Sequence, residues 1–502
     1  MNYSSYIIGL IIPFLSFIFQ TYPRFFNKYY GVDVWTRLIE ADLIRKNNHK
    51  VPMKKISNGF ILDGYFDYPP ALAWLLSYIP KKKLLNIQGF IAPIFDVIQN
   101  YLVFLICLQI TPSLEIALLA QAIYGAIPLT ILENSYLTPR SLGYLNFTLA
   151  LFPLLVYSVI PRIEYLIVGF VFLVILFFTH KFAVQSFFFI SIFMTIFERN
   201  PFYILIFFTG MITAIIISKG YYLRILRGHI VNIIYWTKIY NYRFAHQIRG
   251  LGKVEKKDFV NQIYSILFMF SPATLIGVNL WIIIPLGISL AYFYGFKLAY
   301  LSDPLMIKLI IWVDFFYIIG VLILAIKQLI PIGDGQRYIE MVIVPTALIS
   351  SITFFSLLQT PYKTLTIVCY SLIFIINIIL TIIMQIKAIV YNKDRSLTKD
   401  MKKVFTYINK LKPKSRIICI PPRITTMILY HTSASVLVEI QAGGLIKAND
   451  VFPVIRRSIP EIAKKYNLNL LVLKKDYVNM EELNLSKKSL LLETDTTQVF
   501  RI

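Results

Sequence analysis

The chain has 502 residues, of which 57% are hydrophobic and only 15% are charged. With a mean hydropathy of +0.67 it is far more apolar than the core of a water-soluble domain requires, so lipid must be the solvent for most of it. The formal net charge of +24 does not indicate nucleic-acid binding, because the basic residues are scattered among apolar segments instead of clustering in one arginine-rich stretch. Membrane lipids with anionic headgroups are the expected partners.

Segments that are apolar and long enough to cross a bilayer recur along the chain. They are expected near 4–22, 88–110, 114–132, 141–160, 163–179, 181–197, 201–218, 262–290, 305–328, 340–358 and 363–391. The sequence therefore predicts an α-helical polytopic protein of the cell membrane with about eleven transmembrane helices. Two alternatives stay open for 262–300, which forms either one helix kinked at Ser271-Pro272 or two shorter helices.

Three segments interrupt this series: a polar loop at 23–87, a basic loop at 219–261 and a tail that begins at about residue 395. The tail alternates helix-like segments with short β-rich segments, which is typical of a small α/β domain. The expected helices are Thr398–Leu411 and Val454–Tyr466, and the expected strands are Arg416–Ile420, Leu468–Leu473 and Gln498–Ile502. We therefore expect a membrane domain over 1–392 and a C-terminal α/β domain over 393–502.

The polar loop contains Asp33 shortly after the first span. Apolar and charged residues segregate at helical spacing over Thr36–Arg45, so an amphipathic helix is expected to lie on the membrane with Asp33 near its start. Asp33 either caps this helix or presents a carboxylate at the membrane surface that can accept a proton.

A second acidic residue of this loop, Asp67, precedes Tyr68 and the pair Pro69-Pro70. Two prolines stiffen the backbone and prevent a helix from starting before them, so Asp67 and Tyr68 are expected on an ordered turn. The alternative is that this turn only leads into an interfacial helix.

Cationic residues occur in the next loops. Arg140 begins the fourth apolar helix, where a positive charge opposes the helix dipole and an anionic ligand would relieve the repulsion. His180 and Lys181 occupy a tight turn between two apolar helices, and they either bind substrate or form a plain polar hairpin. The basic loop 219–261 has nine Lys and Arg residues interleaved with Tyr and Trp, so it is expected to lie on anionic headgroups.

Arg337 and Tyr338 lie in the polar segment from Gly333 to Glu340. An arginine beside glycines at the start of a helix can place its guanidinium fork on phosphate oxygens. The alternative is that Arg337 extends to the membrane interface as a long cationic side chain. The sequence Arg-Tyr-x-Glu at 337–340 is similar to segments of membrane proteins in polysaccharide pathways.

If the amino terminus is cytoplasmic, the loops with these residues lie on the outer face, and the first loop and the C-terminal domain are extracytoplasmic. The first loop has 11 Lys and Arg residues against five Asp and Glu, which runs against the positive-inside rule. That rule is weaker for long loops, and basic residues near a phosphate-bearing substrate would give another reason for the excess.

The first 80 residues resemble the membrane glycosyltransferases of the GT-C superfamily, which use sugars linked to dolichyl or polyprenyl phosphate. The resemblance rests on an Asp shortly after the first span, an amphipathic helix, and then Asp-Tyr-Pro-Pro-x-Leu at 67–72. Enzymes of this superfamily typically use an acidic residue of the first external loop as catalytic base or acceptor-binding group, and Asp33 is the positional match. Val32 and Val34 flank it where many relatives have a pair of acids.

The resemblance implies a GT-C-like fold and an inverting transferase that passes a hexosyl or pentosyl unit from a polyprenyl-phosphate donor to a glycan, lipid or protein acceptor. Asp33 would be the catalytic base, with Asp67 as the competing candidate. The candidate substrate-binding residues are Arg337, Tyr338, Arg140, His180, Lys181 and Tyr68. No cofactor is expected, and a requirement for a divalent metal stays open.

Two other functions stay open as alternatives. A polysaccharide or lipid-linked oligosaccharide flippase or transporter would be expected to have charges within the membrane and repeated halves, but the spans contain few charges, Asp96 and Asp314 among them. An O-antigen-type polymerase would depend on a large basic loop such as 219–261 in place of Asp33.

Overall fold

The structure, a computed structural model, describes residues 3–31, 33–56, 59–62, 64–238, 272–295, 303–392, 396–411, 414–437, 447–452, 455–475, 477–478 and 480–502. The chain divides into two compact units, each assembled from segments that are distant in sequence. The first unit comprises Met1–Lys28, Ile87–Lys219 and Lys257–Tyr391, and the second comprises Tyr29–Asn86, Gly220–Lys256 and Asn392–Ile502. The division into domains 1–392 and 393–502 stays a prediction, although the last break between the units falls one residue from it.

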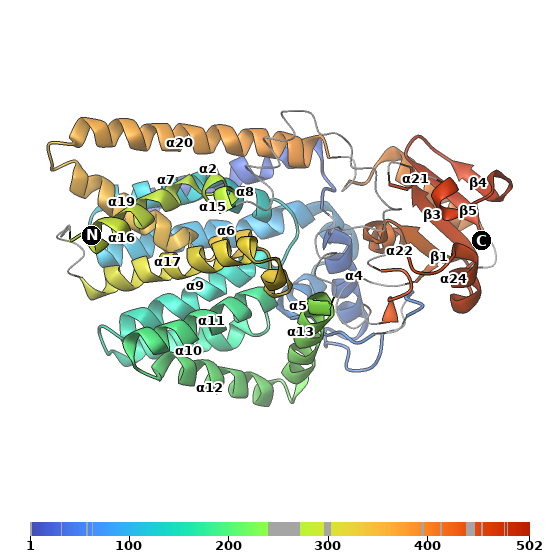
Figure 1. The fold of residues 1–502 in the computed structure, drawn as a ribbon, viewed down its shortest axis with the longest axis horizontal. Helices are drawn as coiled ribbons and strands as arrows, with labels where there is room; N and C mark the ends of the chain where they lie inside the picture. Colours follow the sequence, from blue (N-terminus) through green and yellow to red (C-terminus); the bar gives the residue numbers. More distant parts are fainter. Residues whose placement is uncertain are drawn as a thin grey trace. The chain divides into compact units, whose positions relative to one another are not determined.

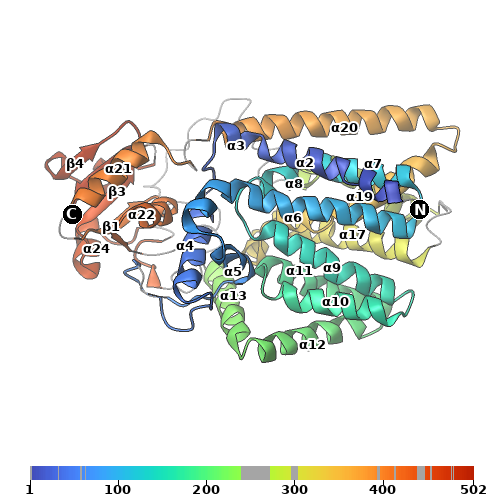
Figure 2. The same ribbon diagram turned by 180° about the vertical axis from the view of Figure 1, so that it is seen from behind.

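The first unit is built from helices that run side by side (Figures 1 and 2). They are α1 (Tyr3–Ile8), α2 (Ile11–Thr21), α3 (Pro23–Phe26), most of α6 (Lys81–Ile110), α7 (Leu114–Ala126), α8 (Pro128–Asn134), α9 (Arg140–Tyr157), α10 (Ile163–Leu176), α11 (Lys181–Glu198), α12 (Phe202–Ile217), α15 (Pro272–Gly277), α16 (Ile283–Phe293), α17 (Pro304–Ala325), α18 (Gly335–Glu340), α19 (Ile343–Leu357) and α20 (Lys363–Gln385).

Several of these helices can cross a membrane, so the chain is a multi-pass membrane protein. By length and composition, five described stretches qualify: Tyr3–Phe26, α6, α11, α17 and Lys363–Val390. A sixth is formed if α7 and α8, which meet at an angle of 61°, make one bent span. Four shorter apolar helices accompany them, and the expected number of about eleven spans is not confirmed. The proposed kink at Ser271 lies outside the described residues.

A buried carboxylate joins four helices of the first unit. Asp96 of α6 accepts hydrogen bonds from the Tyr124 hydroxyl of α7 at 2.6 Å, from the Asn134 amide of α8 at 2.7 Å, and from the Gln20 amide of α2. A carboxylate is costly within a membrane unless donors surround it. These bonds therefore fix the positions of α2, α6, α7 and α8 relative to one another.

The tail forms a five-stranded sheet in the order β2-β1-β3-β5-β4 (Figure 1). The strands are β1 (Arg416–Ile420), β2 (Ser435–Val436), β3 (Leu470–Lys474), β4 (Leu490–Glu493) and β5 (Thr497–Arg501), with helices α21 (Lys399–Lys410), α22 (Thr425–His431) and α24 (Ile459–Tyr466). Strand β1 is parallel to β2 and β3, whereas β3 pairs with β5, and β5 with β4, in antiparallel fashion. The five residues of β3 are all buried, as expected of a central strand with an apolar sequence. The predicted α/β character of the tail is confirmed.

The first loop packs against this tail within the second unit. It contains α4 (Asp33–Lys46) and α5 (Ala71–Ser77). The backbone amide of Ile61 donates to the Val436 carbonyl at 2.8 Å, and Trp35 of α4 lies against the His431 ring with 4.7 Å between centroids. The predicted helix over 36–45 is therefore confirmed, but its predicted position on the membrane surface is wrong, because protein covers its apolar side chains.

Part of the predicted basic loop is a helix, α13 (Tyr221–Lys238). Tyr235 and Trp236 are buried near its end, and the Tyr235 hydroxyl donates to the carbonyl of Phe452 in the tail at 3.0 Å. The prediction of a loop is therefore wrong for 221–238, while 239–261 lies outside the described residues.

Candidate functional site

The residues singled out from the sequence fall into two clusters, one in each unit. Asp33, Asp67 and Tyr68 belong to the second unit, whereas Arg140, His180, Lys181, Arg337 and Tyr338 belong to the first. We describe each cluster separately.

Two members of the cluster in the second unit, Asp67 and Tyr68, line a cavity of about 50 Å³, here called the acidic cavity, together with Glu40 and others. Glu40 accepts a hydrogen bond from Arg37 at 2.5 Å, and both side chains are almost fully buried. The guanidinium carbon of Arg37 lies 4.1 Å from the centroid of the Tyr68 ring, which is the geometry of a cation–π contact. Arg37 thus links the helix α4 to the turn that contains Asp67.

Two carboxylates of this cluster influence the pKa of a third, Glu40. Burial raises the pKa of Glu40, the Arg37 guanidinium opposes that rise, and the nearby charges of Asp33 and Asp67 add to it. Asp33 and Asp67 are therefore both within electrostatic range of the same buried group. Arg37 is the cation that pairs with Glu40, and a buried carboxylate with a raised pKa beside two others makes this cluster a candidate functional site.

Helix α13 holds the turn with Asp67 in place. The Tyr221 hydroxyl lies 3.0 Å from the Phe66 carbonyl oxygen and 3.3 Å from that of Tyr68, and it donates to both. A side chain at Gly228 would bring its Cβ within 3.0 Å of the Cβ, Cγ and Oδ2 atoms of Asp67. The absence of a side chain at Gly228 therefore allows the helix to approach the Asp67 carboxylate closely.

In the first unit, Arg140 is paired with two carboxylates. Its guanidinium contacts Glu133 and lies 3.6 Å from Oε1 of Glu340. The relief that the sequence analysis expects from an anionic ligand is therefore supplied in the structure by protein carboxylates. Glu340 lies in the short helix α18, outside the candidate spans, and burial raises its pKa to about 7 against the opposing charge of Arg140.

Aromatic contacts connect His180 and Tyr338 to the helices that contain Arg140 and Arg337. His180 is buried with its ring edge-on to Tyr144 in the first turn of α9. The ring of Phe182 lies 4.7 Å from Tyr338 and 5.9 Å from the Arg337 guanidinium carbon. The structure therefore brings the basic candidates of α9, α11 and α18 to one end of these helices, with Lys181 as the first residue of α11.

Protein groups on both sides hold the hydroxyl of Tyr338. The hydroxyl donates to the Ile332 carbonyl at 3.0 Å and accepts from the Gln185 amide at 2.8 Å, and the ring is fully buried. This geometry suits a supporting residue that holds α18 against α11.

Two carboxylates of these clusters, Glu40 and Glu340, are not among the site residues predicted from the sequence. Glu40 follows Arg37 by three residues, which is also the spacing of ordinary exposed ion pairs on a helix. Glu340 was noted only as part of the segment at 333–340. Sequence spacing alone does not reveal that either carboxylate is buried.

Metal ligation is not evident in the described part of the chain. Among those residues, no group of three or more His, Cys, Asp and Glu side chains is placed to hold a metal ion. We therefore assign no metal ligand.

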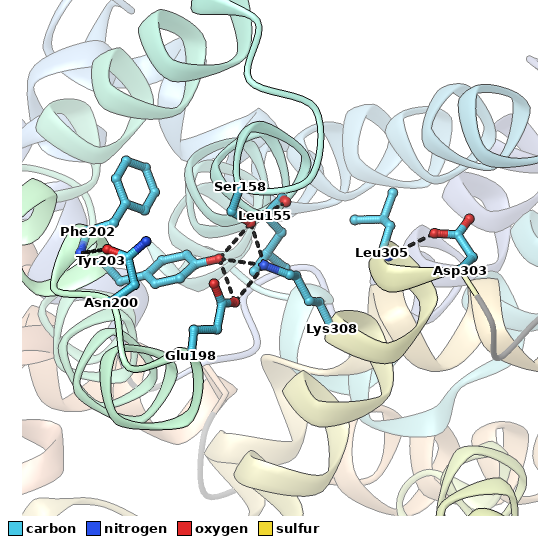
Figure 3. A network of polar contacts seen from close by, with 9 residues as sticks. All are labelled: Leu155, Ser158, Glu198, Asn200, Phe202, Tyr203, Asp303, Leu305 and Lys308. Atoms are coloured by element: carbon cyan, nitrogen blue, oxygen red, sulfur yellow. Dashed lines mark hydrogen bonds and ion pairs between the residues drawn. The ribbon is translucent and has the colours of Figure 1, made fainter.

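A third polar cluster lies at the opposite end of α9 and α11 (Figure 3). Lys308 of α17 donates to Glu198 at 2.6 Å and to the Ser158 hydroxyl at 2.7 Å. The Tyr203 hydroxyl, at the start of α12, donates to the same two groups at 3.1 and 2.8 Å. The four residues close a network in which each charge has a partner, so this cluster ties helix ends together.

Comparison with solved structures identifies the fold. Oligosaccharyltransferase from Archaeoglobus fulgidus in its apo form superimposes with a TM-score of 0.59 at 13% identity, covering 97% of this chain and 72% of that chain. The chain has the fold of this oligosaccharyltransferase. The complex of that enzyme with zinc and sulfate gives 0.58 at 12% identity, covering 97% and 71%. An archaeal oligosaccharyltransferase from the same organism, in complex with an inhibitory peptide and a dolichol-phosphate, gives 0.55 at 12% identity, covering 96% and 70%.

The similarity spans nearly the whole chain, so the GT-C-like fold expected from the first 80 residues is confirmed. No family model matches the sequence. No curated protein matches it in a sequence search either. At 12–13% identity the likeness is one of fold, and the activity is argued below from the residues.

Proposed function

We propose that this chain is a membrane glycosyltransferase that transfers a sugar from a polyprenyl-phosphate-linked donor to a glycan, lipid or protein acceptor on the outer face of the membrane. The observation that carries the proposal is the acidic cavity, because it presents the proton-accepting groups that such a transfer needs. The fold supports it, since one of the similar structures holds a dolichol-phosphate and an inhibitory peptide.

The acceptor must lose a proton when its new bond to the sugar forms, and a carboxylate is a suitable base. Asp33 has this role if the resemblance of the first loop extends to mechanism. Asp67 is the alternative that the cavity favours, because it lines the cavity and α13 holds its turn. Arg37, Glu40 and Tyr68 act as positioning residues in both cases.

The leaving group is an anionic phosphate, which cations stabilise as the bond to the sugar breaks. In our proposal Arg140, Arg337, His180 and Lys181 bind this phosphate, and Tyr338 supports them. Protonation of Glu340 removes one of the two carboxylate charges that hold Arg140, so in our proposal the guanidinium is then shared between Glu133 and the phosphate. The product is inverted at the anomeric carbon if the acceptor attacks from the face opposite the phosphate.

The test is transfer by purified protein in detergent with a panel of radiolabelled polyprenyl-phosphate sugars. Replacing the base by the isosteric amide, Asp33→Asn or Asp67→Asn, should lower turnover by roughly 10²- to 10⁴-fold and leave donor binding in place. Glu493→Gln, at an exposed carboxylate of the tail, is the control and should leave turnover unchanged. If donor is bound but no sugar is transferred, and neither Asp variant changes the outcome, the chain is not a glycosyltransferase.

A further inference from the structure

A second hollow lies beside the acidic cavity in the second unit, here called the lysine hollow. Its volume is about 610 Å³, and it is bordered by α4, by Gly59, and by α22 with the residues after it. Ile39 and Leu43 of α4 line both spaces, so the two are neighbours on either side of these residues. The hollow is large enough for a phosphorylated sugar or a lipid headgroup.

The walls of the hollow are fixed by tight packing. Trp35 of α4 lies 5.4 Å from the Tyr430 ring of α22, and this contact holds the two helices together. Gly59 has a φ of +82°, and a Cβ there would lie 2.3 Å from Leu429. Gly59 is therefore needed to let its loop close against α22 at the wall of the hollow.

The hollow has an excess of positive charge. Lys46, Lys81 and Lys414 line it, whereas Asp42 is the one carboxylate among the residues that line it. Lys46 and Lys81 lie 2.9 and 3.8 Å from the same oxygen of Asp42, so two ammonium groups share one negative charge. Lys414 has no ion-pair partner within the described residues.

Asp42 is also held by Arg45, which does not line the hollow. Arg45 donates to the second oxygen of Asp42 at 3.0 Å and to the Ile79 carbonyl at 2.6 Å. Burial alone would raise the pKa of Asp42, but the hydrogen bond from Lys46 and the charges of Lys81 and Arg45 hold it below its ordinary value. Asp42 is therefore ionised at neutral pH and still leaves two positive charges of the hollow unbalanced.

These groups suit a phosphate. Lysine ammonium groups are compact point charges that bind phosphate oxygens from several directions, and the exposed Ser433 hydroxyl on the same wall adds a neutral donor. Lys81 is in addition the first residue of α6, a helix that can cross a membrane by its length and composition. We propose that the lysine hollow binds a phosphate-bearing ligand through Lys46, Lys81 and Lys414, next to the acidic cavity and independently of sugar transfer.

The test is titration calorimetry of the full chain in a neutral detergent with two probes, inorganic phosphate and a short-chain phosphatidic acid. The test variant replaces Lys46, Lys81 and Lys414 together by Gln. The matched control replaces three exposed lysines of the tail, Lys464, Lys487 and Lys488, and so removes the same net charge elsewhere. Binding should weaken at least tenfold in the test variant and change less than twofold in the control.

The two probes distinguish the source of the phosphate. Binding of both through the hollow, or of phosphatidic acid alone, indicates a lipid headgroup, whereas binding of inorganic phosphate alone indicates a soluble phosphate compound. Equal weakening in both triple variants would mean that only the overall charge matters, and it would overturn the proposal, as would the absence of binding by either probe. If the triple variant does not fold, Lys414→Gln replaces it, because this lysine makes no ion pair with any residue that the structure describes, and unchanged binding in that variant would overturn the proposal.

Discussion

Glu340 and Glu40 both show how burial changes the behaviour of a carboxylate at a single position. Each has one arginine as its principal partner, and each has a raised pKa because burial outweighs that partner. Removing one partner of such a pair leaves the other buried without a compensating charge. Substituting the carboxylate and substituting the arginine therefore have different effects. What a substitution does therefore depends on whether it removes the carboxylate or the cation.

The first prediction concerns Glu340. Its pKa is raised from 4.5 to about 7, so between these values the folded protein holds a proton that the unfolded chain has lost. Folding stability from this group therefore rises as the pH falls through 7 toward 4.5, and in the same window Arg140 loses the charge attraction of Glu340 and keeps its contact with Glu133. We expect Glu340→Gln to bind a polyprenyl-phosphate sugar several-fold more tightly at pH 8 and to lose most of the pH dependence of binding between pH 8 and 6.

Equilibrium binding at several pH values checks this. Glu164→Gln, at an exposed carboxylate of α10, should keep the wild-type pH dependence. Weaker binding by Glu340→Gln at pH 8 would show that Arg140 does not contact the donor's phosphate.

The second prediction concerns Lys308, whose ammonium group compensates Glu198 at the other end of the helices (Figure 3). Lys308→Met should destabilise the protein by roughly 2–3 kcal/mol, because Glu198 keeps its charge without its strongest donor. The double variant Lys308→Met with Glu198→Gln should recover part of this loss, since no unpaired charge remains. Thermal unfolding in detergent measures both, with Lys363→Met at an exposed position as the control. Equal losses in the single and double variants would show that the pair itself contributes little.

At the scale of elements, hydrophobic periodicity located most helices well. The predicted spans at 141–160, 163–179, 181–197 and 201–218 agree with α9 to α12, and the predicted strands agree with β1, β3 and β5. Periodicity indicates that one face of a helix is apolar but not whether lipid or protein covers that face. For this reason the sequence predicts α4 on the membrane surface, whereas in the structure the tail covers it. In α13, basic residues alternate with aromatic ones, and the sequence did not show that Tyr235 and Trp236 are buried against the tail.

The third prediction concerns the close approach of α13 to the acidic cavity. In a helix Ala is favoured over Gly by about 1 kcal/mol, so Gly228→Ala should not unfold α13. Its new methyl group must displace the Asp67 side chain, which lies within 3.0 Å of the new atom. If Asp67 is the base, we expect turnover to fall at least tenfold with little change in donor binding or unfolding temperature.

The control for this variant is Gly287→Ala in α16, where a new Cβ meets no atom within 4 Å. That variant should keep full turnover. If Gly228→Ala also keeps full turnover while Asp33→Asn does not, the base is Asp33 and α13 has no part in positioning it.

At the scale of the whole molecule, the assembly of the second unit from three distant segments cannot be predicted from the sequence pattern. The first loop, α13 and the tail are separated by more than a hundred residues in the chain. Their association depends on long-range contacts such as the backbone hydrogen bonds from Ile61 and Leu62 to Val436 and Leu437. Local periodicity carries no information about such pairings, so Asp67 and Tyr68 could be found as candidates but not placed at one cavity, and Asp33 could not be placed in the same unit.

The last prediction follows from that pairing. Two segments joined by backbone hydrogen bonds lie on the same side of a membrane, so the first loop and the tail share a side whatever the number of spans. In a variant without Cys107, Cys369 and Cys419, single cysteines at the exposed positions Lys54 and Lys464 should react alike with a membrane-impermeant maleimide in intact cells. The orientation predicted from the sequence places both of these positions outside, so both cysteines should react. It also predicts that a cysteine at Asn200, in the turn after the sixth predicted span, is protected. Reaction at one of the first two positions without the other would contradict the pairing of loop and tail, whereas protection of both with reaction at Asn200 would keep the pairing and reverse the orientation.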